Sequence, residues 1–115
     1  MNDDQTSVAQ LKRMMADFVA ERRWQPFHDA KNLSMAIAIE AGELMEHFQW
    51  LRSDQLEQVV SSGELDEIGD ELADVMCFVL SLANVLGIDL SSAIERKMVK
   101  NATKYPADEF QGRFR

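Results

Sequence analysis

The stretch Ile39-Glu40-Ala41-Gly42-Glu43-Leu44-Met45-Glu46 decides how this chain folds and what it can bind. It places two carboxylates, Glu40 and Glu43, three positions apart inside an apolar run. Residues three apart lie on the same face of a helix. On a helical wheel of about 100° per residue, Leu33 and Leu44 fall close to Glu40. We therefore expect both carboxylates to point toward the core rather than into solvent.

A second acidic pair, Glu71 and Asp74, repeats this spacing later in the chain. It belongs to a stripe on one helical face that contains Glu67, Asp70, Glu71, Asp74, Phe78, Ser81 and Val85. Carboxylates that lose water without gaining a partner are costly to bury, and carboxylates that face one another repel. A hard divalent cation such as Mg²⁺ prefers oxygen ligands and would resolve this conflict. We expect the two pairs to form one metal site; the alternative is two solvated helix faces.

The composition is that of one small globular domain spanning residues 1–115. Apolar residues make up 46% of the chain, charged residues 28%, and the net charge is −8. This acidity argues against a nucleic-acid partner. Because no signal peptide and no apolar run of membrane-spanning length is evident, we expect a cytoplasmic protein without a membrane partner. Cys77 lies in an apolar helical run and is expected to be a small buried hydrophobe.

Glycine and proline are scarce and strand-like alternation is absent, so the sequence predicts an all-α fold. Four long helices are expected, ending near Arg23, Leu51, Leu86 and Lys104, with a short helix in the connector at 53–60 and little packing for 107–115. The second long helix is apolar on nearly every side, and Met35, Ile39 and Met45 lie away from the Glu40 face. A helix of this kind is buried all round. We therefore predict a four-helix bundle completed by oligomerisation.

Two further groups of side chains are candidates for binding a ligand. A polar, partly cationic face on the fourth helix is formed by Lys97, Asn101 and Lys104. It either contacts phosphate oxygens or is simply solvated. Rings near helix ends are Trp24, Phe27, His28 and Trp50. They either stack on a nucleobase or pack in a core or interface. Phosphate-loop, dinucleotide and zinc motifs are absent, and the histidines lack the Glu-x-x-His spacing of di-iron bundles.

These residues resemble the MazG-like nucleoside triphosphate pyrophosphohydrolases, particularly the short branch that includes the dCTP pyrophosphatases. The resemblance covers roughly residues 18–106. It is carried by the two acidic pairs and by the segments 24–28, 48–50 and 97–106. It implies an all-α fold and Mg²⁺-dependent, house-cleaning hydrolysis of a (deoxy)nucleoside triphosphate to monophosphate and pyrophosphate, with dCTP-like substrates favoured. It also implies a homodimer or homotetramer with sites at subunit contacts.

The same resemblance assigns roles to individual residues. The catalytic and Mg²⁺-holding set would be Glu40, Glu43, Glu71 and Asp74. Independently of the resemblance, Glu46 and Asp70 lie close to these pairs in sequence and are expected to support the ligands. The substrate-binding set would be Trp24, His28, Trp50, Phe78, Lys97, Asn101, Lys104 and Tyr105. Phe78 departs from the pattern, because dCTP-specific members carry a Tyr there and Phe lacks the hydroxyl. Two other function classes stay open: a non-catalytic helical interaction module, and a nucleotide sensor without turnover.

Overall fold

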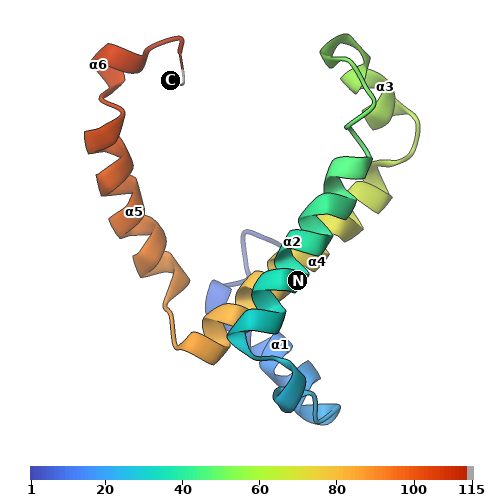
Figure 1. Ribbon diagram of the computed structural model, residues 1–115, viewed down its shortest axis with the longest axis vertical. Helices are drawn as coiled ribbons and strands as arrows, with labels where there is room; N and C mark the ends of the chain where they lie inside the picture. The colour runs from blue at the N-terminus through green and yellow to red at the C-terminus, as the bar shows by residue number, and fades with distance from the viewer. Residues whose placement is uncertain (114–115) are drawn as a thin grey trace.

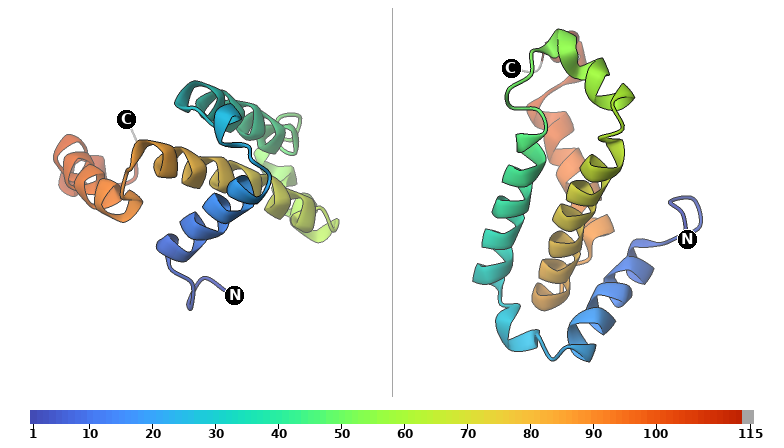
Figure 2. Two further views of the ribbon diagram at one scale, coloured as in Figure 1. Left: turned by 90° about the horizontal axis from the view of Figure 1, so that it is seen from below. Right: turned by 90° about the vertical axis from the view of Figure 1, so that its right-hand side faces the viewer.

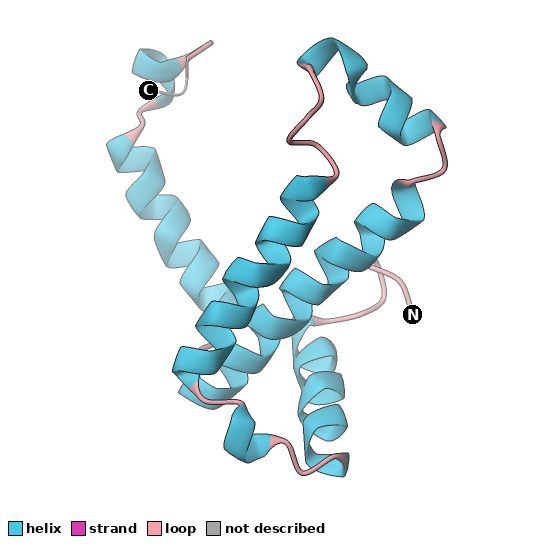
Figure 3. Ribbon diagram, turned by 45° about the vertical axis from the view of Figure 1, so that its right-hand side comes forward, coloured by secondary structure: helices cyan, strands magenta, loops and turns pink. Residues whose placement is uncertain are grey.

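The computed structural model describes residues 1–113, and among these it contains helices and no strand (Figures 1 and 3). The helices in chain order are α1 (Val8–Glu21), η1 (Gln25–Phe27), α2 (Ala30–Glu46), η2 (Ser53–Gln55), α3 (Leu56–Ser61), α4 (Leu65–Leu86), α5 (Leu90–Lys104) and α6 (Ala107–Phe110). The all-α prediction and its four long helices are confirmed.

Polar caps account for where three of the four long helices begin. Ser7 and Gln10 form a capping box at the start of α1, and Asp29 and Asp89 accept backbone hydrogen bonds at the starts of α2 and α5. Each cap satisfies an amide that has no partner inside its helix. Gly87 ends α4 with φ of 65°, a left-handed conformation that glycine adopts without the steric cost of a side chain.

The second long helix is shorter than predicted, because α2 ends at Glu46 rather than near Leu51. The His47 amide donates to the Leu44 carbonyl at 3.3 Å, and the Phe48 amide donates to the Met45 carbonyl at 2.9 Å. These bonds span three residues instead of four, so they tighten the last turn and end the α-helix. The aromatic residues that follow therefore lie in turns.

The C-terminal segment also differs from the prediction, since residues 107–110 form the one-turn helix α6. The Pro106 carbonyl accepts hydrogen bonds from the amides of Glu109 and Phe110, both at 3.0 Å. The rings of Tyr105 and Phe110 meet edge to face, with centroids 5.2 Å apart. This ring contact gives the segment a packing partner that the sequence did not reveal. Residues 114–115 lie outside the described part of the chain.

The centre of the molecule is an antiparallel pair, α2 and α4, with α1 packed across the C-terminal half of α4 (Figure 2). Leu33 on α2 and Leu80 on α4 are each only 2% exposed. Val19 on α1, Val59 on α3 and Ile68 on α4 complete most of the buried core. Burying these side chains is the main stabilising term that holds the helices together.

The fourth long helix, α5, leaves this core. α4 and α5 are bent by 100° at their junction, and α5 does not pack along any other long helix within residues 1–113 (Figure 1). The radius of gyration is 17.3 Å, against about 13 Å for a compact domain of this length. A single chain is therefore an open assembly of three packed helices and one separate helix.

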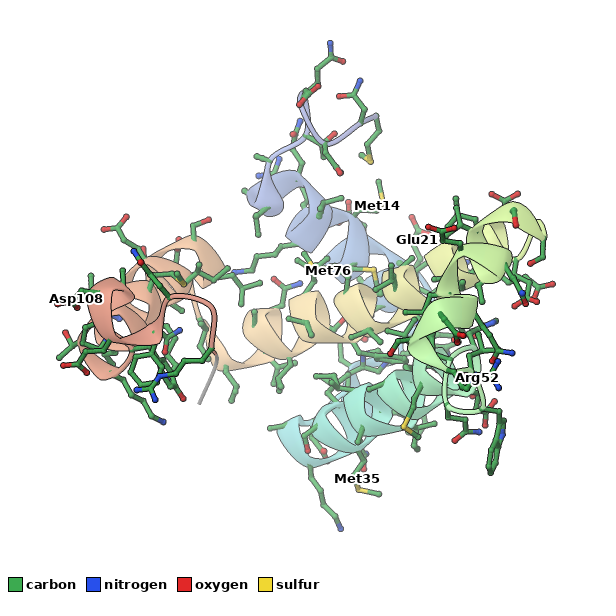
Figure 4. The ribbon with its side chains drawn as sticks, turned by 90° about the horizontal axis from the view of Figure 1, so that it is seen from above. Met14, Glu21, Met35, Arg52, Met76 and Asp108 are labelled. Carbon is green, nitrogen blue, oxygen red and sulfur yellow. The ribbon has the colours of Figure 1, made fainter. Side chains whose placement is uncertain are left out.

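Large apolar side chains are exposed on both α2 and α5. On α2, Met35, Ile39 and Met45 are between 52% and 60% exposed, and Figure 4 shows Met35 projecting from the face turned away from α4. On α5, Ile94 and Val99 are more than 60% exposed. The burial predicted for α2 on every side is thus not achieved within one chain.

No single described helix has both the length and the apolar character of a membrane span, although the bent pair α4 and α5 meets those two criteria when taken together.

Candidate active site

Three carboxylates from two helices meet on the facing sides of α2 and α4. One oxygen each from Glu40, Glu43 and Glu71 lies within 4.8 Å of the others. Glu40 and Glu71 are half-buried and Glu43 is exposed. One oxygen of Glu40 and one of Glu71, the Oε2 atom in each case, is inaccessible and accepts no hydrogen bond from the described residues. We call these three residues the carboxylate cluster.

The electrostatics of the carboxylate cluster favour protonation. Burial, together with a hydrogen bond to Glu43 and its charge, raises the pKa of Glu40 to about 7. The charges of Asp74 and Glu71 act in the same direction. Burial and Glu43 also raise the pKa of Glu71, opposed by His47. Near neutral pH the cluster therefore keeps a proton on Glu40 in part of the molecules unless a cation supplies positive charge.

Asp74, the fourth predicted ligand, lies at the edge of this cluster. It is exposed, and no oxygen of Asp74 falls within the set of close carboxylates in the described chain. Its charge nevertheless raises the pKa of both Glu40 and Glu71, so it faces the same space. The structure thus brings together three of the four predicted carboxylates and places the fourth beside them.

The donor set of the carboxylate cluster fits a hard cation. It offers only carboxylate oxygens, and two of them are buried without a partner among residues 1–113. Such oxygens suit Mg²⁺ or Ca²⁺, whereas softer metals favour imidazole or thiolate. His47 lies nearby but pairs with Glu64, with Nδ1 and a carboxylate oxygen 3.8 Å apart. This pair was not anticipated, because His47 and Glu64 are separated by the whole connector.

A pocket of about 340 Å³ opens between α1 and α4. Its α1 wall is apolar and includes Met15, Ala16 and Ala20, while Ser81 and Val85 line it from α4. Ser81 follows Glu71 by ten positions on the same helix, which corresponds to about 15 Å along the axis. Pockets of this size and polarity typically hold small organic molecules.

One of the predicted base-binding residues lines this pocket, and a second stacks on the first. His28 lines it, and the ring of Trp24 stacks on His28 with centroids 6.2 Å apart and planes 29° apart. Phe18 contacts the edge of Trp24 at 5.7 Å, and the Arg22 guanidinium lies 3.6 Å above the Phe18 ring. These contacts hold Trp24 against α1 while leaving the residue 42% exposed.

Trp50 is not part of this group. It follows α2, whereas Trp24 and His28 precede α2, and the 17 residues of that helix span about 25 Å. Trp50 is 86% exposed. Phe78, by contrast, is half-buried on α4 between Asp74 and Ser81. The two tryptophans that the sequence grouped together thus lie at opposite ends of α2 within one chain.

The phosphate-contacting residues expected on α5 are also separate from the cluster. Lys97 and Lys104 are exposed, Asn101 is half-buried, and the Lys104 ammonium lies 5.2 Å from the Tyr105 ring centroid. Because α5 leaves the core, these side chains do not approach the carboxylate cluster of their own chain (Figure 1). Cys77 is half-buried, and burial raises the pKa of its thiol, so it is not an activated nucleophile.

The chain is thus an all-α protein in which an antiparallel helix pair brings together carboxylates from both helices. An apolar pocket opens farther along α4. Residues 35–113 match the MazG-like family. The chain belongs to the MazG-like family.

Known proteins resemble the chain over most of its length. dCTP pyrophosphatase 1 of Homo sapiens is 37% identical over 102 residues, covering 88% of this chain and 60% of that protein. The Bos taurus protein of the same name is 35% identical, covering 92% of this chain and 63% of its own length. This chain therefore spans less than two thirds of these curated relatives. The crystal structure of a pyrophosphatase from Archaeoglobus fulgidus superposes with a TM-score of 0.82 at 36% identity, covering 92% and 98% of the two chains.

Proposed function

We propose that this protein hydrolyses a (deoxy)nucleoside triphosphate to the monophosphate and pyrophosphate, with dCTP-like substrates favoured and Mg²⁺ as cofactor. The observation that carries the proposal is the carboxylate cluster, whose two buried, unpartnered oxygens would be stabilised by a bound cation. The names of the mammalian relatives and of the archaeal structure support the same reaction class.

Glu40, Glu43, Glu71 and Asp74 are the residues that would hold Mg²⁺. When bound, the ion would polarise phosphate oxygens and lower the pKa of a water molecule. The neighbouring carboxylates would accept hydrogen bonds from the attacking water, and one that is not fully used as a ligand would accept its proton. The water oxygen would bond to the α-phosphorus while the bond from that phosphorus to the bridging oxygen breaks, so that pyrophosphate leaves. Glu46 and Asp70 lie close in sequence to the ligands and would orient them.

The pocket between α1 and α4 is proposed as the nucleoside site. Asp74 and Phe78 lie on α4 between the carboxylate cluster and this pocket. The sugar and phosphates of a nucleotide would lie along this part of the helix. The His28 ring lines this pocket and the Trp24 ring stacks on it, so an aromatic face is available for stacking on a base. The ring of Phe78 adds apolar surface to the same path.

The proposal includes self-association into a homodimer or homotetramer, with α2 and α4 in the interface. The exposed apolar side chains of α2 and α5 would lose contact with water there. A second copy would also supply what one chain keeps apart, namely the α5 face of Lys97, Asn101, Lys104 and Tyr105, together with Trp50. Sedimentation at micromolar concentration tests this, and a stable monomer would contradict it. A cytoplasmic location completes the proposal.

The decisive experiment incubates the purified protein with a panel of ribo- and deoxyribonucleoside triphosphates, with and without Mg²⁺, and measures pyrophosphate and monophosphate. We expect pyrophosphate release that depends on Mg²⁺ and is fastest with dCTP-like substrates. Release of orthophosphate instead would assign cleavage to a different phosphorus. Mg²⁺-dependent nucleotide binding without any release would indicate a sensor, and neither binding nor release would favour an interaction module.

A further inference from the structure

Ser81 is a buried hydroxyl that its own helix does not satisfy. It lies in α4, is 4% exposed, and its Oγ has no hydrogen-bond partner in residues 1–113. Other helical hydroxyls in this chain do bond to a carbonyl about one turn back: Ser34 to Lys31 at 2.8 Å and Ser61 to Glu57 at 3.0 Å. Because an unmade hydrogen bond at a buried hydroxyl is destabilising, Ser81 requires an explanation.

The surroundings of Ser81 point to a ligand. It lines the pocket between α1 and α4, where the remaining α4 and α1 residues are mainly apolar. Asn84 also lines the pocket, but its side-chain amide already donates to the Lys12 carbonyl at 2.9 Å. His28, contributed by the segment before α2, has a buried Nδ1 without a partner in the described chain. Two different elements thus bring unpartnered polar atoms to one largely apolar pocket.

The size and chemistry of this pocket fit a heteroaromatic ring. Ala16 and Ala20 leave space along α1, and Val85 supplies apolar surface from α4. Such walls suit the faces of a nucleobase, while the few polar groups fix the orientation of its edge. A hydroxyl can both donate and accept, so Ser81 can pair with a ring nitrogen, a carbonyl or an exocyclic amine.

We propose that Ser81 is a specificity-determining residue whose hydroxyl hydrogen-bonds the polar edge of a pyrimidine base in the pocket that His28 also lines. This inference rests on the proposed function, because the carboxylate cluster on the same helix would hold the phosphate end of the nucleotide. It adds a residue from the α4 wall to the aromatic side chains already expected at the base. It also explains why the hydroxyl is left without a partner in the free protein.

Ser81→Ala gives a test whose signs distinguish binding from structure. The substitution removes a hydroxyl that contributes no hydrogen bond to the free protein, so the melting temperature should stay the same or rise. The KM for the preferred pyrimidine nucleotide should rise about threefold to tenfold, as expected for losing one hydrogen bond to an uncharged group. The kcat, and the KM for poorly used purine nucleotides, should change much less.

Ser34→Ala is the matched control, because Ser34 is an exposed serine in α2 whose hydroxyl bonds within its own helix. We expect this variant to keep the nucleotide preference of the parent. A preference profile of Ser81→Ala identical to the parent's would overturn the proposal. A lowered melting temperature with a uniform loss across all nucleotides would also overturn it, since that result assigns Ser81 to packing alone.

A second measurement separates this inference from the proposed reaction. Parent and Ser81→Ala are titrated calorimetrically with deoxycytidine monophosphate in the absence of Mg²⁺, so that neither turnover nor the metal contributes. Weaker binding by the variant, by the same factor as the KM change, supports the role of Ser81 even if the protein releases no pyrophosphate. Equal affinity of both proteins refutes that role while leaving the carboxylate chemistry intact.

Discussion

The two tryptophans provide a prediction in which the structure separates residues that the sequence treats alike. Trp24 packs against Phe18 and His28 and is 42% exposed, whereas Trp50 is 86% exposed in the turns after α2. Both are proposed to contact the base. If so, replacing either with Ala should weaken nucleotide binding, but only the Trp24 variant should also lose much stability.

The expected loss of stability follows from the buried surface. With a tryptophan surface of about 250 Å², the exposures imply roughly 145 Å² buried for Trp24 and roughly 35 Å² for Trp50. At about 25 cal/mol per Å², these areas correspond to about 3.6 and about 0.9 kcal/mol as upper values. For a chain of this length, about 4 °C per kcal/mol gives a fall in Tm of about 14 °C for Trp24→Ala and about 4 °C for Trp50→Ala.

The binding effect should be similar for both variants. Loss of one stacking ring costs about 1–3 kcal/mol, so the KM should rise roughly 5-fold to 150-fold. The assay measures KM for pyrophosphate release across the nucleotide panel, and Tm by calorimetry at two protein concentrations. Trp50→Phe is the control, because it keeps an aromatic face and should retain most of the affinity.

Two results would refute this reasoning. A fall in Tm for Trp50→Ala as large as that for Trp24→Ala, at both protein concentrations, would mean that the Trp50 indole is part of the fold of one chain. Unchanged KM values for both variants with every nucleotide would mean that the two rings pack against protein and do not contact the base. If the Tm loss of Trp50→Ala grows as the protein is diluted, the indole instead packs against a second copy.

Three further predictions concern charge. Glu71→Gln removes one repelling carboxylate, so without metal the variant should melt no lower than the parent. At a Mg²⁺ concentration 100 times its Kd the parent should gain about 2.7 kcal/mol of stability, while the variant should gain little and release almost no pyrophosphate. Equal Mg²⁺ binding by both proteins in calorimetry would contradict this prediction. Lys97→Gln should leave Tm nearly unchanged, because Lys97 is exposed, yet lower kcat/KM; a large stability loss with normal catalysis would place Lys97 in the fold instead. The pKa of Glu40 rises from 4.5 to about 7 on folding, so its contribution to metal-free stability is complete below pH 4.5 and is lost as the pH rises through about 7. Between pH 5 and 8 the Tm should therefore fall more steeply for the parent than for Glu40→Gln. Parallel curves would refute the raised pKa of Glu40.

Helical register explains why the carboxylate cluster could be predicted from the sequence. Residues three apart must share a helical face, so the acidic pairs had to project as two compact groups. Their apolar neighbours on the same faces, such as Leu33 and Phe78, indicated that these faces turn toward another helix. The meeting of Glu40, Glu43 and Glu71 follows from those two facts.

The parts that the sequence did not reveal depend on contacts between distant segments. An amphipathic face indicates burial but does not identify its cover, so the separation of α5 from the core could not be foreseen. Proximity to a helix end likewise does not say which ends meet, and Trp24 and Trp50 fall at opposite ends of α2. Ser81 was visible only as one more position on the acidic stripe. Its significance appears when α1 is placed against α4.

The charge distribution implies an order of events at the proposed site. A chain of net charge −8 that gathers three carboxylates in one cluster repels a triphosphate until positive charge arrives. Lys97 and Lys104 cannot supply that charge to their own cluster, because α5 lies apart from α2 and α4. In the proposed mechanism, a cation neutralises the cluster before substrate enters, and a second copy brings its lysines to the outer phosphates. On this argument, the affinity for a nucleoside triphosphate should depend on Mg²⁺ and on protein concentration together, and removing either should abolish tight binding of the triphosphate.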